Sequence, residues 1–217
     1  MNILRDILLR PRRAAERLRA RPRWLGPFLF LALLSVILYG LRFESQVDDV
    51  LRHLPPSADL SAREQTRQAL RGDLWRECLF LPYRLALGWG GFACVLFLSG
   101  RAFTRDRTAL YRHVLALEIH AEVILLFPAL FLLAGIPLPS LGLAFPGESR
   151  GFLLDSLLRV TNCFTLWYIL TLSVGMAVLF GLRTRTAFLV VAVCWGMTES
   201  LNLGVLNLLT RSFHFHL

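Results

Sequence analysis

The sequence predicts an all-α, polytopic membrane protein: a bundle of five transmembrane helices with a cytoplasmic N-terminus and an extracytoplasmic C-terminus. Three observations predict this fold class. The chain has five long apolar stretches, the excess of arginine in the connecting loops falls on one side of the membrane, and the loops are too short for a core of their own. Each stretch is close to the roughly 20 residues that a helix needs to cross the hydrocarbon, and an isolated span in lipid must be helical. The stretches are Trp24–Leu41, Leu79–Gly100, Leu115–Gly135, Val160–Leu182 and Ala187–Leu209.

The basic residues set the orientation. All 24 are arginine, and the formal net charge is +9. With the N-terminus inside, the cytoplasmic segments carry 14 arginines and three acidic residues, whereas the outer segments carry nine of each. This distribution obeys the positive-inside rule, so the charge reflects topology and does not indicate nucleic-acid binding. The cytoplasmic segments are 1–23, 101–114 and 183–186, and the outer segments are 42–77, 136–159 and 210–217.

Residues 1–23 form a separate, amphipathic element. Apolar residues recur at helical spacing before and after Pro11, among many arginines. Such a helix beside a span typically lies at the headgroups of anionic lipid, and a docking helix for a cytoplasmic partner is the alternative. The arginines expected to contact headgroups are Arg12, Arg13, Arg17 and Arg19.

Residues 24–209 form one membrane domain with two outer loops, 42–78 and 136–159, followed by a short outer tail, 210–217. Ser61 and Glu64 have the spacing of a capping box, which predicts a short helix to about Trp75 on the outer surface. The loop 136–159 is rich in proline and glycine and is expected to lie on the bilayer surface. The cysteines form no CxxC pair, which favours buried, unpaired thiols, and a bridge between Cys78 and Cys163, both near the outer end of a span, is the alternative.

Four ionisable side chains fall inside the predicted spans, and such groups are functional candidates by default. Glu118 and Glu122 are four residues apart, so they share one side of span three and are expected to face the bundle interior or to reach an inner arginine. Arg84 is expected to extend to the outer headgroups. Glu199 near the middle of span five is a candidate for a proton or ion pathway, or for a hydrogen bond to a residue such as Asn162.

No metal or cofactor site is predicted. His113 and His120 resemble metal ligands by composition, but helical geometry puts them on the side opposite to Glu118 and Glu122. The spacing also differs from the His-Glu-x-x-His pattern of zinc hydrolases, and no nucleophile–base pair is visible. We therefore expect a protein that is not an enzyme.

Small residues mark surfaces for close helix packing, either within the bundle or against a second membrane protein. Span five repeats them every fourth residue, and span four has a looser version. The positions are Ala192, Gly196, Ser200 and Gly204 in span five, and Ser173, Ala177 and Gly181 in span four.

The order of these features resembles the Yip1-domain family of integral membrane proteins. The resemblance is carried by the leader with Pro11, the Arg-Pro-Arg-Trp24 run, Leu98-Ser99-Gly100-Arg101-x-Phe103, Pro128 with Pro137, Trp167 with Gly175, and Ala187. It implies a five-helix bundle without enzymatic activity. Eukaryotic members are associated with vesicle trafficking and small GTPases, but this chain lacks their long N-terminal region and Asp-Leu-Tyr-Gly-Pro motif. The chain therefore resembles the bacterial branch, in the cytoplasmic (inner) membrane, some members of which are accessory subunits of MacB-like ABC exporters.

Two functions are compatible with these features. The first is a non-enzymatic scaffold or accessory subunit that binds lipids and either another integral membrane protein, such as an ABC-type export complex, or a second copy of itself. The second is a small transporter or channel that uses Glu199, Glu118 and Glu122.

Overall fold

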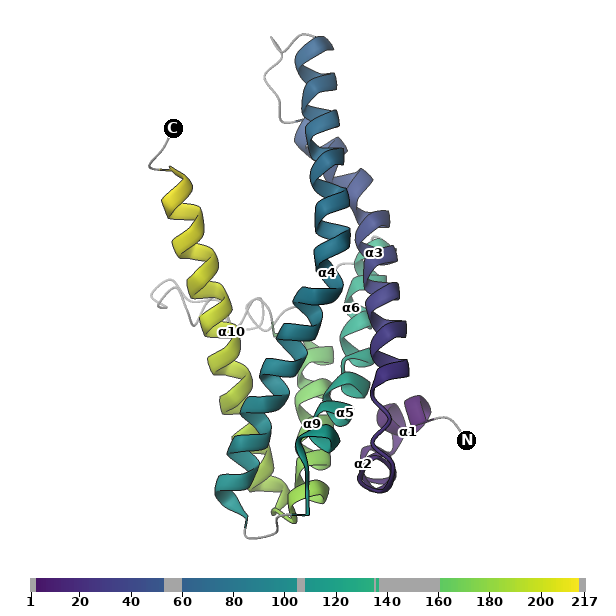
Figure 1. The fold of residues 1–217 in the computed structure, drawn as a ribbon, viewed down its shortest axis with the longest axis vertical. Helices are drawn as coiled ribbons and strands as arrows, with labels where there is room; N and C mark the ends of the chain where they lie inside the picture. The colour runs from purple at the N-terminus through teal and green to yellow at the C-terminus, as the bar shows by residue number, and fades with distance from the viewer. Residues whose placement is uncertain (1–2, 53–59, 105–107, 135, 137–160, 215–217) are drawn as a thin grey trace. The chain divides into compact units, whose positions relative to one another are not determined.

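A computed structural model of the chain describes residues 3–52, 60–104, 108–134, 136 and 161–214. Regular structure within these ranges is helical, and they contain no strand, so the all-α prediction is confirmed (Figure 1). The helices are α1 (Ile3–Leu9), α2 (Pro11–Ala20), α3 (Leu25–Arg52), α4 (Leu60–Phe103), α5 (Tyr111–Ala121), α6 (Val123–Leu133), α9 (Cys163–Phe180) and α10 (Thr184–His214).

The chain divides into two compact units. One comprises Met1–Trp24 and Gly91–Leu217, and the other comprises Leu25–Gly90. Helix α4 contributes its first part to the second unit and its last part to the first. The candidate sites discussed below lie in the first unit, apart from Arg84.

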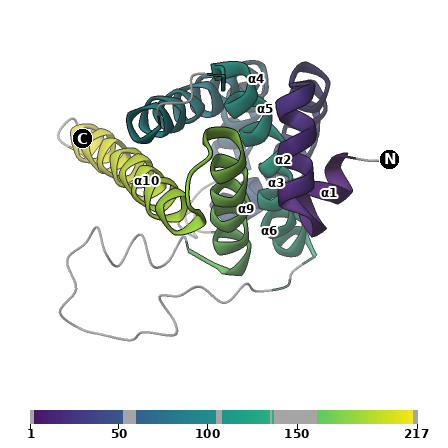
Figure 2. The same cartoon turned by 90° about the horizontal axis from the view of Figure 1, so that it is seen from below.

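Helix α9 is the centre of the first unit. It contacts α10 on one side and α2, α5 and α6 on the other, as Figure 2 shows. Asn162 begins the helix, because its Oδ1 accepts hydrogen bonds from the backbone N–H groups of Phe164 and Thr165 at 2.9 and 3.0 Å. Gly181 ends it with φ of 64°, and Leu182 N–H then donates to the Ala177 carbonyl. A left-handed residue and this hydrogen bond are typical of a Schellman cap, which turns the chain directly into α10.

The leader forms two short helices that dock on the bundle. Pro11 separates them, since proline fits the first turn of a helix but is disfavoured in a helix interior. Ile7, Ala14 and Leu18 are fully buried, and α2 packs against both α9 and α5. The leader was expected to lie on lipid, but its apolar side is covered by protein.

The third predicted span is interrupted in its middle. Helix α5 ends at Ala121 and α6 begins at Val123, with a tight turn at Glu122, whose carbonyl accepts from Leu125 N–H at 2.9 Å. This i→i−3 bond is of the 3₁₀ type. Pro128 lies inside α6.

The second unit is a pair of helices, α3 and the first part of α4. Phe28 and Trp89 meet edge to face with ring centroids 5.7 Å apart. Large apolar side chains on both helices are exposed, including Leu33 and Leu87. Contiguous exposed apolar surface of this kind is what a lipid-facing helix presents.

The predicted outer segment 42–78 is more helical than expected within the described residues. Helix α3 continues to Arg52, and the short surface helix expected over 61–75 is instead the first part of the 44-residue helix α4. Once a helix has formed, adding residues is inexpensive, and α4 continues through Pro82 to Phe103. The expected tail 210–217 is likewise helical as far as His214.

Among the described residues, three helical segments are long and apolar enough, by length and composition, to cross a membrane: Arg63–Phe103, Tyr111–Phe131 and Cys163–Phe180. Leu25–Leu41 is a shorter apolar segment of α3. The chain is therefore a polytopic membrane protein. Its predicted loop 136–159 lies outside the described residues, except for Ile136.

The four cysteines are free, in keeping with their spacing. Only Cys194 is buried, with its Sγ 3.4 Å from Ser99 Oγ, whereas Cys94 and Cys163 are exposed. The expectation of general burial was wrong because an apolar thiol is equally compatible with a lipid-facing position.

Candidate functional site

A buried polar cluster joins α5 to α9. The Tyr168 hydroxyl on α9 donates to Oε1 of Glu118 at 2.6 Å and lies 3.3 Å from Oε1 of Glu122. Glu118 is 1 % exposed and Tyr168 is 2 % exposed. Two carboxyl groups and a phenol therefore share one site in the interior of a membrane domain.

Helix geometry explains how the two carboxyl groups meet one hydroxyl. Glu118 and Glu122 are separated by one turn, and Glu122 N–H donates to the Glu118 carbonyl at 3.0 Å across the junction of α5 and α6. The tight turn at Glu122 keeps both side chains directed at α9. The break between α5 and α6 thus lies at the polar cluster.

A glycine allows α9 to approach α5 closely enough for this contact. A Cβ atom added at Gly175 would lie 2.4 Å from a methyl carbon of Leu117, far inside van der Waals contact. Leu117 is fully buried and precedes Glu118 directly. Gly175, one of the residues that carried the family resemblance, therefore holds the two helices at the spacing that the cluster needs.

A similar close contact occurs at the end of α4. A Cβ added at Gly100 would lie 2.6 Å from the Phe180 ring. Phe180 also packs against Phe97, over which the Arg101 guanidinium lies at 5.2 Å from the ring centroid. The Leu98–Phe103 motif thus packs the end of α4 onto the end of α9.

Polar atoms in this region remain unsatisfied. Among the described residues, Glu118 Oε2 has no hydrogen-bond partner, and neither has Thr171 Oγ1, one helical turn from Tyr168 on the same side of α9. Unsatisfied buried polar atoms are rare and call for an explanation, such as a bound water or ion. The cluster can thus accept a hydrogen bond, a proton or a cation.

The two histidines do not join the carboxylates. His113 Nδ1 accepts from Leu110 N–H at 2.9 Å, and His120 Nδ1 lies 2.7 Å from the Ala116 carbonyl. In the part of the chain that the structure describes, no group of three or more His, Cys, Asp or Glu residues could hold a metal ion. His113 instead supports the start of α5, and the Arg19 backbone is a further partner of its ring.

The other ionisable candidates lie apart from the cluster. Glu199 is half-buried on α10, and within the described ranges no hydrogen bond or ion pair to it is found. Asn162, suggested as its partner, uses its side-chain oxygen to cap α9. Arg84 pairs with Glu77 at 2.8 Å, about two turns closer to the start of α4, and both side chains are exposed.

The small residues have different surroundings. Ser173 is buried and donates to the Ile169 carbonyl at 2.6 Å, while Ala177 and Ala192 pack against the core. Gly181 lies beyond the end of α9 as its cap. Gly196 faces open space, since a Cβ there would meet nothing within 4 Å. Ser200 donates to the Gly196 carbonyl at 2.7 Å, and Gly204 lies in α10 where side-chain surroundings are not described.

The four leader arginines divide into two pairs. Arg17 forms an ion pair with the buried carboxylate of Asp6, which ties α2 to α1. Arg19 donates to Thr108 Oγ1 at 3.0 Å and to the Val178 carbonyl in the last turn of α9 at 3.3 Å. Arg12 pairs with exposed Glu16, and both Arg12 and Arg13 are exposed.

The family model of the Yip1 domain matches residues 5–198. The chain belongs to the Yip1 domain family. No curated protein and no solved structure matches it. Yip1 domain proteins are in general non-catalytic membrane proteins, and the apolar helices of this one agree with that class.

Tyr168 is the one residue of the cluster that sequence reasoning missed. A tyrosine in an apolar stretch is commonly an interfacial residue, so its type gave no reason to prefer it. Relative depth gave no signal either: Glu118 lies three residues, less than one turn, from the cytoplasmic end of its predicted span, whereas Tyr168 lies 14 residues, about four turns, from that of its own.

Proposed function

We propose that this Yip1 domain protein is a non-enzymatic scaffold or accessory subunit that binds another integral membrane protein through α10. The binding surface, which we name the α10 surface, comprises Val193, Gly196, Met197, Ser200 and Leu201. The membrane is the bacterial cytoplasmic membrane. The chain crosses it five times with its N-terminus inside, as the distribution of arginine favours.

The observation that carries the proposal is the row of small residues, which opens outward at Gly196. Ala192 packs on the core of its own unit, but one turn later the row faces open space. A glycine inside a helix costs about 1 kcal/mol relative to alanine, and nothing within the described residues requires a glycine here. In lipid, small residues let a second helix approach closely.

Large side chains beside Gly196 supply the rest of the surface. Val193, Met197 and Leu201 are 58 %, 62 % and 67 % exposed and repeat every fourth residue. They form a ridge next to the shallow position at Gly196, and ridges and grooves are the elements of helix–helix packing. Methionine adapts well to a partner surface because it is unbranched and flexible.

The proposed class of partner is an ABC-type exporter with a MacB-like membrane subunit, as the resemblance to bacterial members suggests. Self-association through the same surface is the alternative. The exposed Arg12 and Arg13 are proposed to contact lipid headgroups, as Arg84 is at the outer side.

The test is co-purification of the full chain, at native expression in mild detergent, with and without Gly196→Leu. We expect a defined membrane-protein partner to be lost in this variant. Gly88→Leu is the matched control: Gly88 also faces open space in a long helix, but its neighbours at four-residue spacing are the large Arg84 and Phe92. Equal recovery of the partner in both variants would refute the assignment of the α10 surface.

The second candidate function is a small transporter or channel, favoured by the unsatisfied Glu118 Oε2 in the cluster and by the half-buried Glu199. Glu118, Glu122 and Glu199 would then carry protons or ions. Proton or cation flux into proteoliposomes distinguishes the two functions. If the wild-type protein conducts protons or cations and Glu118→Gln or Glu199→Gln abolishes the flux, transport is favoured. If the wild-type flux equals that of empty vesicles, the scaffold function is favoured.

A further inference from the structure

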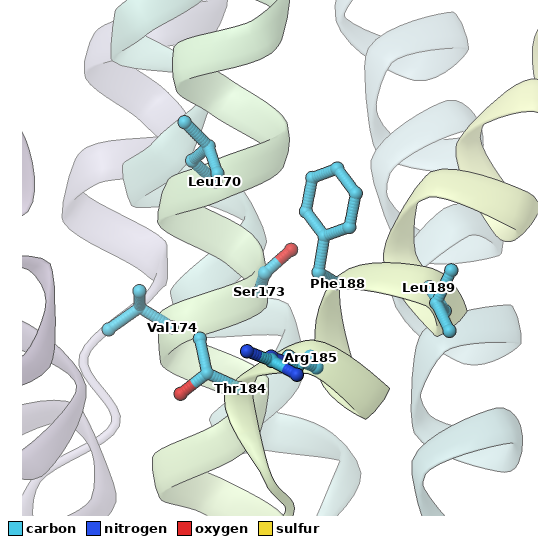
Figure 3. Close-up of a pocket in the computed structure, with 7 residues that line it drawn as sticks. All are labelled: Leu170, Ser173, Val174, Thr184, Arg185, Phe188 and Leu189. Atoms are coloured by element: carbon cyan, nitrogen blue, oxygen red, sulfur yellow. The ribbon is translucent and has the colours of Figure 1, made fainter.

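A groove on the surface of the first unit runs between α9 and α10, beside the turn that joins them. Its volume is about 420 Å³, within the range of roughly 300 to 1,000 Å³ that is usual for ligand clefts. Its walls are almost entirely apolar, with Leu170 and Val174 from α9 and Phe188 and Leu189 from α10 (Figure 3). It is therefore suited to an apolar chain.

Two polar residues, Thr184 and Arg185, line one end of this otherwise largely apolar groove. Thr184 and Arg185 begin α10, and both are exposed. In Figure 3 the Arg185 side chain lies beneath Ser173 and Phe188, at the end of the groove next to the α9–α10 turn. No ion pair of Arg185 occurs among the residues described, so its guanidinium is available to an anion.

The start of α10 adds donors of its own. The first turn of any helix has backbone N–H groups without intrahelical acceptors, and its dipole attracts negative charge. Here the Gly181 cap turns the chain so that this first turn and the Arg185 side chain belong to the same groove end. A phosphate at this end of the groove would meet the side chains of Arg185 and Thr184, beside the positive end of the α10 dipole.

The length of the groove also fits one leaflet of a bilayer. From the end of α9 at Phe180 to Leu170 is ten residues, or about 15 Å of helix, which is half the hydrocarbon thickness of about 30 Å. A chain that entered beside Arg185 would follow α9 to the midplane.

We propose that this groove binds an anionic phospholipid, with its phosphate at Arg185 and Thr184 and one acyl chain along Leu170, Val174 and Phe188. The apolar walls take the chain, and the single cation at the end selects an anionic headgroup over a zwitterionic one. The site is separate from the exposed leader arginines and from Gly196, so it does not depend on the identity of a protein partner.

The test is native mass spectrometry of the full chain, titrated in zwitterionic detergent with dioleoylphosphatidylglycerol, dioleoylphosphatidylcholine or inorganic phosphate. We expect phosphatidylglycerol to bind most tightly and phosphate alone to be retained poorly. Arg185→Ala should weaken phosphatidylglycerol binding by about tenfold or more, since a charge-assisted pair is lost. Arg183→Ala is the matched control, because Arg183 is exposed on the same turn but does not line the groove.

Val174→Trp should block the acyl chain and weaken phosphatidylglycerol binding while Arg185 remains. Leu170→Trp provides a second block at the exposed end of the groove if the first variant melts at a lower temperature. Equal binding of the two lipids, or equal effects of Arg183→Ala and Arg185→Ala, would overturn the proposal. If Val174→Trp abolishes a dimer of the protein but leaves lipid binding unchanged, the lipid proposal is overturned and a second copy of the protein occupies the groove.

Discussion

The Tyr168 hydroxyl on α9 donates a 2.6 Å hydrogen bond to Glu118 on α5, and both side chains are almost completely buried. The bond joins helices that are 50 residues apart in the sequence and lies beside a tight turn in the third predicted span. It is a buried polar link between two helices whose surrounding core consists largely of apolar side chains.

Removing the hydroxyl should destabilise the first unit. We expect Tyr168→Phe to lower the free energy of unfolding by about 1 to 3 kcal/mol, because a buried carboxyl loses its partner. Unfolding by SDS in mixed micelles, followed by circular dichroism, measures the change. Tyr83→Phe is the control, since Tyr83 is 63 % exposed on α4. If both variants unfold alike, the hydrogen bond does not stabilise the unit.

The contribution of the pair can be separated from that of each residue by a double-mutant cycle. Glu118→Leu combined with Tyr168→Phe should cost less than the sum of the two single changes, since each alone leaves a buried polar group without its partner. The same unfolding measurement gives the coupling. Additive losses would mean that the two side chains do not interact in the membrane.

The Gly175 contact predicts a steric effect. Gly175→Ala should destabilise the protein by about 1 to 3 kcal/mol, although alanine favours helices, because its Cβ would overlap the buried Leu117 side chain. Thermal unfolding in detergent measures this. Gly196→Ala, with open space around it, should be neutral or slightly stabilising. Restoration of stability in the Gly175→Ala/Leu117→Ala double variant would identify the overlap as the cause, and a failure to restore it would refute that cause.

The docked leader predicts different roles for its arginines. Arg17→Ala should speed the cleavage of residues 1–23 by trypsin, because the buried Asp6 carboxylate loses its partner and the contact between α1 and α2 weakens. Arg12→Ala should not, since the Arg12–Glu16 pair is exposed and worth only about 0.3 to 0.5 kcal/mol. Cleavage is followed by mass spectrometry of the released peptides. Equal rates in the two variants and the wild type would show that the Asp6–Arg17 pair does not hold the leader.

Amphipathicity predicted the leader but not what covers it. The spacing of Ile7, Ala14 and Leu18 shows an apolar side, and lipid or protein can cover such a side equally well. Arg19 contacts Thr108, which is 89 positions away in the sequence, and the Val178 carbonyl, which is 159 positions away. A local sequence pattern cannot indicate contacts between residues so far apart.

The candidate site was also predictable only in part, because a local sequence pattern describes one helix and not its contacts with another. The one-turn spacing of Glu118 and Glu122 is a property of one helix, and it indicated a shared side correctly. Tyr168 comes from another helix, and its role depends on the depth and rotation of α9. The sequence suggested Asn162 as a partner for Glu199. Its side-chain oxygen instead accepts hydrogen bonds from the backbone N–H groups of Phe164 and Thr165, two and three residues later.

Photocrosslinking at native expression tests the scaffold function most directly. A photoreactive amino acid replaces Met197 on the α10 surface or, as a control, the similarly exposed Leu33 on α3. We predict that Met197 crosslinks to one defined integral membrane protein, that Gly196→Leu removes this product, and that Leu33 gives only lipid adducts. If Met197 yields no protein adduct beyond those of Leu33, the proposal that this surface binds a membrane-protein partner is contradicted.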